Sequence, residues 1–188
     1  MKKILLLFFS IIFFSGCSTT LAGDAVETYL MKFKNHEEEV LKSLDELISY
    51  ENLSLKQQEQ YRLVMKRQYQ DLTYKTVQEY YNGDKAIITE EIEVYDYNKS
   101  KRETKEYYEE HQSTLTKGQY QEMQLKAMAS EQKRIKYTID FELNYQEDGW
   151  HLTNLDYTIL QKIHGIYESK KTPFIRQKRS LLNVLIEE

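Results

Sequence analysis

The longest alternation of apolar and polar residues lies in the segment 133–160. Every second position in its first half is apolar, which predicts a strand buried on one face: Ile135, Tyr137, Ile139, Phe141, Leu143 and Tyr145. Residues 146–149 form a turn signal, and Trp150 restarts the alternation. Beyond Asn154 the apolar positions Leu155, Tyr157 and Ile159 continue it out of phase. We therefore predict a hairpin with a β-bulge near Thr153 and Asn154.

Helical spacing dominates the chain before residue 71. Apolar stripes predict helices from Asp24 to about Lys34, from Glu37 through Ile48, and from Ser54 to about Gln70. Asp24 with Glu27, and Ser54 with Gln57, have the spacing of a capping box, and Asn35-His36 breaks the first helix.

The pattern changes to strands after these helices. Residues 72–81 and 86–97 predict two strands joined by Asn82-Gly83-Asp84, with Ile88, Ile92 and Val94 facing inward on the second. The charged segment 98–132 predicts two further helices, around 101–111 and 120–128. The predicted fold class is therefore α+β, with N-terminal helices packed on an antiparallel sheet and a helical insertion between strands.

Composition agrees with one folded domain. The chain has 188 residues, of which 40% are hydrophobic and 30% charged, with a single proline. We place the domain at residues 24–168, followed by a basic tail at 169–188. The tail contains Lys170, Lys171, Arg176, Lys178 and Arg179, and either attraction to anionic lipid or wall polymer or simple solvation accounts for it.

The N-terminus has the features of an export signal. Lys2 and Lys3 precede an eleven-residue apolar region, Ile4 to Phe14, which is too short to span a bilayer. The segment ends in Phe14-Ser15-Gly16-Cys17 and resembles the bacterial lipoprotein signal, with Phe14 where an aliphatic residue is usual. The resemblance implies a signal peptide at 1–16, lipidation of Cys17 and a tether at 17–23. The alternative is a free thiol in an ordinary secretory signal or an uncleaved anchor.

Loss of this signal changes the charge balance. Without Lys2 and Lys3 the chain has 24 basic and 30 acidic residues, a net charge of −6. Because nucleic-acid-binding domains are basic, we expect no nucleic-acid partner. The expected location is extracytoplasmic, on the cell envelope, held by lipid on Cys17.

The order of elements resembles that of exported lipoproteins in the nuclear-transport-factor-two-like, or cystatin-like, superfamily. The resemblance rests on the turn at 82–86, on Tyr95-Asp96-Tyr97 at a strand end, and on Glu147-Asp148-Gly149-Trp150. It implies a strongly bent, cone-like sheet wrapped around the N-terminal helices. Some members use an aspartate and tyrosines inside the cone for catalysis, so the fold leaves function open.

Candidate catalytic residues give weak signals. The four histidines, His36, His111, His151 and His164, lack metal-ligand spacing, and we expect all four at the surface. Among the acids, Asp140 and Glu142 fall on a polar strand face, Asp96 and Asp156 near strand ends, and none on an apolar face. Residues 36–39 are either a metal cluster or a solvated helix start, and we expect the second. We therefore predict no catalytic residue, no metal and no cofactor.

The tyrosines leave one further possibility. The chain has 16 of them, and a set in the central strands and helices either packs amphipathic strands or forms an aromatic binding platform: Tyr74, Tyr80, Tyr81, Tyr95, Tyr97, Tyr107 and Tyr108. We predict a non-enzymatic binding or interaction module whose partner is an envelope protein or a small ligand. The alternatives are a small-molecule or peptide binder that uses the cone cavity and, less favoured, an enzyme of the same fold.

Overall fold

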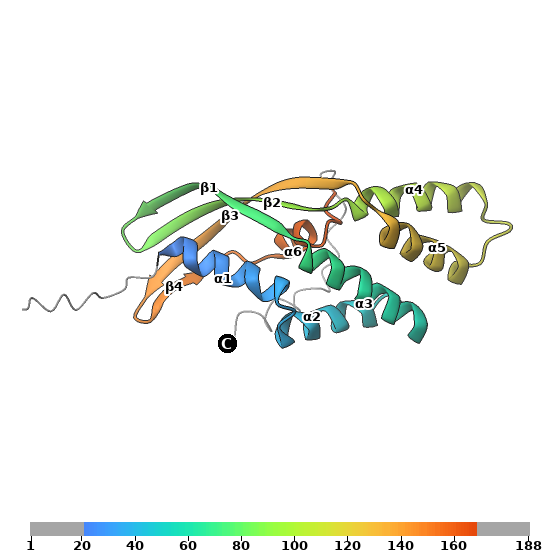
Figure 1. Ribbon diagram of the computed structural model, residues 1–188, viewed down its shortest axis with the longest axis horizontal. Helices are drawn as coiled ribbons and strands as arrows, with labels where there is room; N and C mark the ends of the chain where they lie inside the picture. The colour runs from blue at the N-terminus through green and yellow to red at the C-terminus, as the bar shows by residue number, and fades with distance from the viewer. Residues whose placement is uncertain (1–20, 169–188) are drawn as a thin grey trace, which may run out of the picture.

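The computed structural model describes residues 21–168. The predicted signal peptide, Cys17 and the basic tail 169–188 lie outside the described residues. The described elements follow the order ααα-ββ-αα-ββ-α (Figure 1): α1 (Ala22–Lys34), α2 (Glu38–Ser49), α3 (Leu55–Gln70), β1 (Thr73–Asn82), β2 (Lys85–Tyr95), α4 (Tyr97–Glu110), α5 (Lys117–Ser130), β3 (Arg134–Gln146), β4 (Gly149–Leu152) and α6 (Tyr157–Ile163). The predicted α+β class is confirmed.

The four strands form an open antiparallel sheet in the order β1-β2-β3-β4. A turn at 83–84 joins β1 to β2, and a turn at 147–148 joins β3 to β4. Gly83 adopts the positive φ of 64° that such a tight turn favours. The helices α4 and α5 stand between β2 and β3 in sequence, and they extend from one end of the sheet in Figure 1. The helix α1 packs against the sheet at β2 and β4, and α3 packs against α1, α2 and α5.

The second strand of the last hairpin is shorter than predicted. It ends at Leu152, and the predicted β-bulge near Asn154 is wrong. The Asn154 side chain instead continues the ladder, because it accepts from the Glu142 backbone N–H (2.9 Å) and donates to the Asp140 carbonyl (2.8 Å). Tyr157 and Ile159 belong to α6, which the Asp156 side chain caps at the Ile159 N–H. The irregularity in register lies between Thr76 and Gln78 in β1.

The predicted helix boundaries hold to within a few residues. Ser54 caps α3 with Gln57 in a reciprocal pair, as expected. Asp24 is not the cap of α1, because the helix begins two residues earlier and the Asp24 carboxylate accepts from the Leu21 N–H inside its first turn. Asn35 ends α1, and His36 takes a positive φ of 55° at the break.

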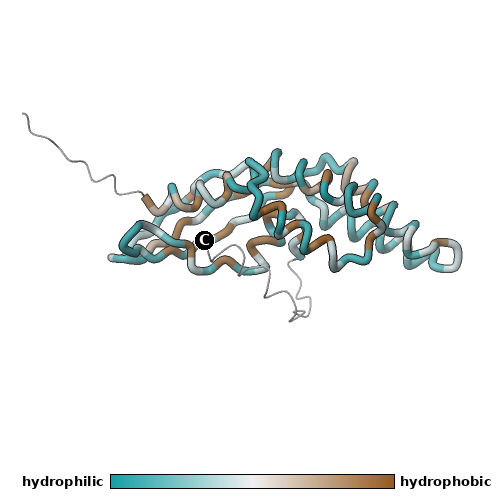
Figure 2. Tube along the Cα trace, turned by 90° about the horizontal axis from the view of Figure 1, so that it is seen from below, coloured by the Kyte–Doolittle hydropathy of each residue, from teal (hydrophilic) through white to brown (hydrophobic). Residues whose placement is uncertain are grey.

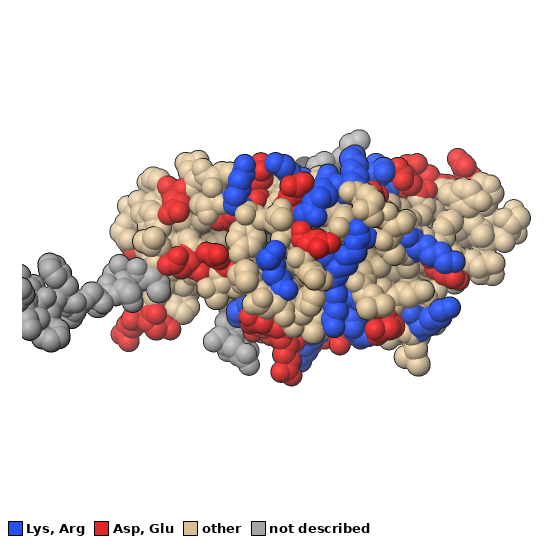
Figure 3. All heavy atoms as spheres, in the orientation of Figure 1, with Lys and Arg blue, Asp and Glu red and all other residues tan. Residues whose placement is uncertain are grey.

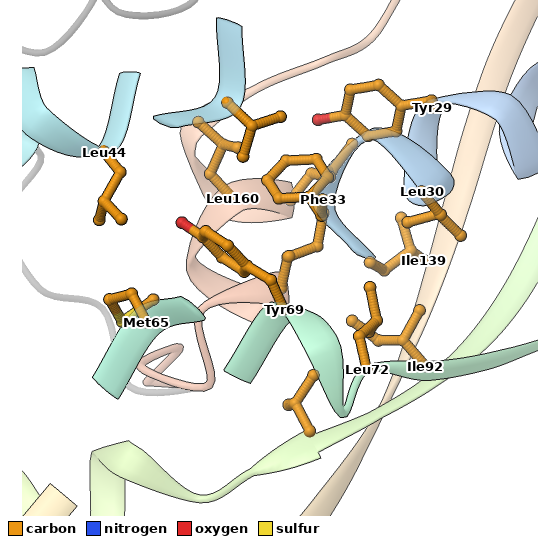
Figure 4. Packing of buried hydrophobic residues seen from close by; sticks show 14 of the residues in the cluster. Tyr29, Leu30, Phe33, Leu44, Met65, Tyr69, Leu72, Ile92, Ile139 and Leu160 are labelled. Atoms are coloured by element: carbon orange, nitrogen blue, oxygen red, sulfur yellow. The ribbon is translucent and has the colours of Figure 1, made fainter. Parts of the chain in front are cut away.

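The core lies between the sheet and the helices, where Figure 2 shows the hydrophobic positions gathered. Edge-to-face ring contacts link Tyr29 to Phe33 and Phe33 to Tyr69, and Figure 4 shows these rings beside Leu30, Leu160 and Ile139. His164 belongs to this core. It is only 7% exposed and its Nε2 lies 2.9 Å from the Tyr69 hydroxyl, so the expectation of a surface histidine is wrong there.

Candidate functional site

Glu90 is an acid on an apolar strand face, contrary to the expectation from the sequence. It lies in β2 between Ile88 and Ile92, which share its parity and are fully buried. Glu90 itself is only 2% exposed. The alternation that predicted inward positions for Ile88 and Ile92 also places Glu90 inward, so the sequence pattern alone could have identified Glu90 as a buried acid. A buried carboxylate inside an apolar stripe is the residue type that most needs a functional explanation.

Only one of the two carboxylate oxygens of Glu90 is satisfied. Glu90 Oε1 accepts a hydrogen bond of 2.6 Å from the Thr76 hydroxyl on the paired strand β1. Glu90 Oε2 is buried and has no hydrogen-bond partner. Buried polar atoms are almost always bonded, and leaving one unbonded lowers stability. The free oxygen is therefore an unused acceptor.

This carboxylate lines an acidic groove of about 270 Å³ between the start of α1 and the inner side of β1 and β2. We call it the Glu90 groove, and its lining is mostly acidic or uncharged: Leu21, Gly23, Asp24, Glu27, Tyr74, Lys75, Thr76, Glu79 and Glu90. The lining cation, Lys75, pairs with Glu91 at 3.2 Å. Because Glu91 has the opposite parity to Glu90 in β2, this pair neutralises the outer face of the sheet and leaves the groove acidic.

The groove acids act on one another electrostatically. Burial raises the pKa of Glu90, the Thr76 hydrogen bond lowers it, and the nearby Glu79 and Glu27 carboxylates raise it again. Burial, Glu27 and Glu90 likewise raise the pKa of the Tyr74 phenol. On the face that Figure 3 shows, acidic rather than basic side chains gather over the end of the molecule where α1 begins. The groove therefore carries a negative potential at neutral pH.

Hydrogen bonds hold the rim of the groove in place. The Tyr81 hydroxyl donates to Glu79 Oε2 at 2.8 Å, and the Tyr81 ring packs edge-on against Trp150 with centroids 5.8 Å apart. Trp150 in turn contacts Tyr145 in the same manner. The Trp150 side chain is partly buried and packs against the core.

The acids that the sequence did single out have structural roles. Asp140 and Glu142 are exposed on the outer face, as predicted. Asp96 and Asp156 are helix caps, whose carboxylates accept from the Lys99 and Ile159 N–H groups. The structure does not bring these four acids into the groove.

The remaining histidines are not grouped. The ring of His36 lies 3.0 Å from the Lys66 carbonyl, that of His111 lies 2.8 Å from the Tyr107 carbonyl, and that of His151 lies 2.7 Å from Asp148. Within residues 21–168, no set of three or more His, Cys, Asp or Glu side chains is placed to hold a metal ion.

The seven tyrosines singled out from the sequence differ in exposure, and Tyr74 and Tyr108 are partly buried. Tyr95 and Tyr97 are buried and stacked on each other, and Tyr95 also donates to Asp71. Exposed rings occur at Tyr80, Tyr81 and Tyr107, on different elements. A second hollow, of about 440 Å³, lies at the tip of the β1–β2 hairpin beside Tyr80 and Ile87. Its lining combines apolar, polar and charged residues, and none of them carries a buried side-chain atom without a hydrogen-bond partner.

Comparison with known proteins adds one distant likeness. No protein-family model and no curated protein sequence matches the chain. Among solved structures the chain is similar to a candidate lipoprotein, ycdA, of Bacillus subtilis, with 14% sequence identity and a TM-score of 0.38. The likeness covers 78% of this chain and 47% of that one, so the chain spans less than half of that protein's length. A TM-score this low supports neither a shared fold nor a shared function.

The described helices are too short or too polar to cross a bilayer, and this holds for residues 21–168. Cys17, the predicted lipidation site, lies outside that range.

Proposed function

We propose that the chain is a membrane-anchored lipoprotein of the cell envelope whose α+β domain is a non-enzymatic binding module, with the Glu90 groove as its ligand site. The single observation that carries the binding site is the buried Glu90 Oε2, which has no partner and belongs to a residue that lines a groove of about 270 Å³. The anchor is inferred from the lipoprotein signal that ends at Cys17.

Physical cost supports a binding role for Glu90. An isosteric apolar residue would fit the stripe formed by Ile88 and Ile92 without desolvating a charge. Proteins keep such locally unfavourable groups mainly where function uses them. A bound donor would satisfy Glu90 Oε2 and recover the lost interaction, so ligand binding explains a residue that folding alone does not.

The volume of the groove indicates what it can accept. Liquid water occupies about 30 Å³ per molecule, so a space of about 270 Å³ corresponds to roughly nine waters. That suits a small ligand or one extended arm of a larger one. The proposed cone-like, nuclear-transport-factor-two-like arrangement fits this site, because the irregularity at Thr76–Gln78 favours a bent sheet beside the groove.

The same groove favours an enzyme as the second candidate. A carboxylate of raised pKa beside Tyr74 has the character of a general base. Proton abstraction, however, leaves an anion on the substrate. Asp24, Glu27 and Glu79 surround that position and would destabilise the anion rather than stabilise it. Binding is therefore the better-supported function.

The anchor is tested by Cys17→Ser in the full chain, with Thr19→Ala as the matched control. We expect Cys17→Ser to abolish labelling with a palmitate analogue and to release the protein from membranes or leave its signal uncleaved. Thr19→Ala should behave as the native protein does. Unchanged labelling and an unchanged mature mass in Cys17→Ser would overturn the anchor.

The ligand site is tested by a thermal-shift screen of the full chain in non-ionic detergent against amines, sugars, amino acids and short peptides. A ligand of the Glu90 groove raises the Tm of the native chain and of the control Glu142→Gln, but not that of Glu90→Gln. Compounds that stabilise all three proteins equally, or no stabilising compound of any class, would overturn the binding proposal.

A further inference from the structure

We infer that the Glu90 groove takes a primary alkylammonium ligand with more than one charge, the chemistry shared by linear polyamines and by closely spaced lysine side chains. This inference rests on the proposed binding function and adds the ligand class. Its starting point is that the groove presents four carboxylates while its one cation is paired on the outer face of the sheet.

The placement of the carboxylates favours a distributed cation over a metal ion. Asp24 and Glu27 come from α1, whereas Glu79 and Glu90 come from β1 and β2. These side chains do not converge on one point, since no described set of three acids or histidines is placed to hold a metal. A ligand that carries its charges along a flexible chain can meet separated carboxylates one by one.

The hydrogen bonding of Glu90 favours an ammonium over a guanidinium. Arginine-type groups bind carboxylates best through two parallel bonds to both oxygens. Thr76 already occupies Glu90 Oε1, whereas Oε2 is buried without a hydrogen-bond partner. One free oxygen matches a compact ammonium donor, whose remaining N–H groups point toward the other acids of the groove.

Apolar surface at the groove suits the alkyl part of such a ligand. Leu21 is 58% exposed at one end of the lining, and the partly buried Tyr74 ring stands beside Glu90 on the adjacent strand. Methylene stems pack on surfaces of this kind while their charged ends contact carboxylates. The aromatic face also attracts a cation directly. Sugars and neutral peptides would leave the carboxylates unpaired.

The test is isothermal titration of the full chain in non-ionic detergent at 150 mM salt, with two amine probes. Spermidine represents free polyamines, and the peptide acetyl-Lys-Gly-Lys-amide represents lysine side chains. Whichever binds more tightly identifies the source, and binding of either supports the inference. We expect Glu90→Gln to weaken binding by about tenfold or more, because the lost bond is charge-assisted.

Glu142→Gln is the matched control, since Glu142 is exposed on the outer face of the sheet and does not line the groove. We expect it to leave the affinity within about twofold, as surface charge contributes little at this salt concentration. Equal weakening by both variants would show diffuse attraction to an acidic protein and would overturn the inference.

Two further readouts separate this inference from the proposed function. Spermidine affinity should rise with pH more steeply in the native chain than in Glu90→Gln, because the ammonium binds the ionised form of the Glu90 carboxylate. The titratable groups that face Glu90 in the groove are Asp24, Glu27, Glu79 and Tyr74. If neither amine binds but a sugar or neutral peptide shows Glu90-dependent binding, the alkylammonium inference falls and the binding function stands. If no probe class depends on Glu90, both fall.

Discussion

Replacing Glu90 by Gln should make the folded protein more stable. The amide keeps an acceptor for the Thr76 hydroxyl and removes a charge that is 2% exposed and only half satisfied. An unsatisfied buried polar group costs about 1–3 kcal/mol and more if charged. Gln places an amide NH2 where Oε2 was, so the gain comes from removing the buried charge rather than the polar atom. We therefore expect the free energy of unfolding at pH 7 to rise by about 1–2 kcal/mol, or by about 2–8 °C in Tm.

The gain should depend on pH in a defined direction. The pKa of Glu90 is raised in the folded protein by burial, despite the Thr76 bond, and by Glu79 and Glu27. The folded state then holds its proton above the unfolded value of about 4.3, so native stability falls as pH rises through that window. Glu90→Gln removes this fall. The difference between variant and native protein should be near zero below pH 4 and largest above the folded pKa of Glu90.

Glu91→Gln is the control with the opposite sign. Hydrogen bonds from Lys136 and Lys75 lower the pKa of the Glu91 carboxyl. This lowered pKa contributes stability above the unfolded value of about 4.3, and the contribution is lost as pH falls. The same substitution one residue away should therefore destabilise slightly at pH 7.

Urea unfolding followed by circular dichroism at pH 4 to 8 measures both effects. A Glu90→Gln protein that is less stable than the native one at pH 7, or a difference that does not change with pH, would refute the account of a buried, unsatisfied carboxylate.

Three structural predictions use the same unfolding assay. Gln68→Leu should lose about 2–4 kcal/mol, because the fully buried Gln68 amide accepts from and donates to the backbone of Tyr95, whereas no loss would contradict that role. Gly165→Ala should lose about 2–4 kcal/mol, since φ is +67° and a Cβ there meets the Tyr95 carbonyl, while Gly83→Ala, with φ +64° and open space, should lose only about 1–2. Asn154→Ala should lose about 1 kcal/mol by ending the ladder beside β3, and an unchanged midpoint would count against it.

Local pattern was enough to predict most elements. The inward set Ile88, Ile92 and Val94, the turn at Gly83 and the reciprocal cap of Ser54 and Gln57 all depend on neighbours within a few residues. Such signals are local because hydrogen bonds in helices and the period of a strand repeat over short distances. The α+β class followed from their order.

Only the tertiary structure decided where polar side chains take the place of backbone groups as hydrogen-bond partners of a strand. The Asn154 side chain bonds to the β3 backbone at the position where the sequence predicted a β-bulge. The Gln68 side chain, on α3, donates to the carbonyl of Tyr95 at the end of β2, 27 residues away in sequence. His164 is buried because α6 places it against Tyr69. Each contact is long-range, and no periodicity along the chain encodes such a pairing.

The sequence by itself predicted an export signal, and it determined the acidic balance and the parity that puts Glu90 among inward residues, since these depend on composition and spacing alone. Tertiary structure decided that the carboxylate is unsatisfied and that α1 brings two more acids beside it. The physical reason is that burial and electrostatic potential are properties of the surroundings in space. The first turn of α1 and the strand residue Glu90 lie more than sixty residues apart in the chain, and packing alone makes them one groove.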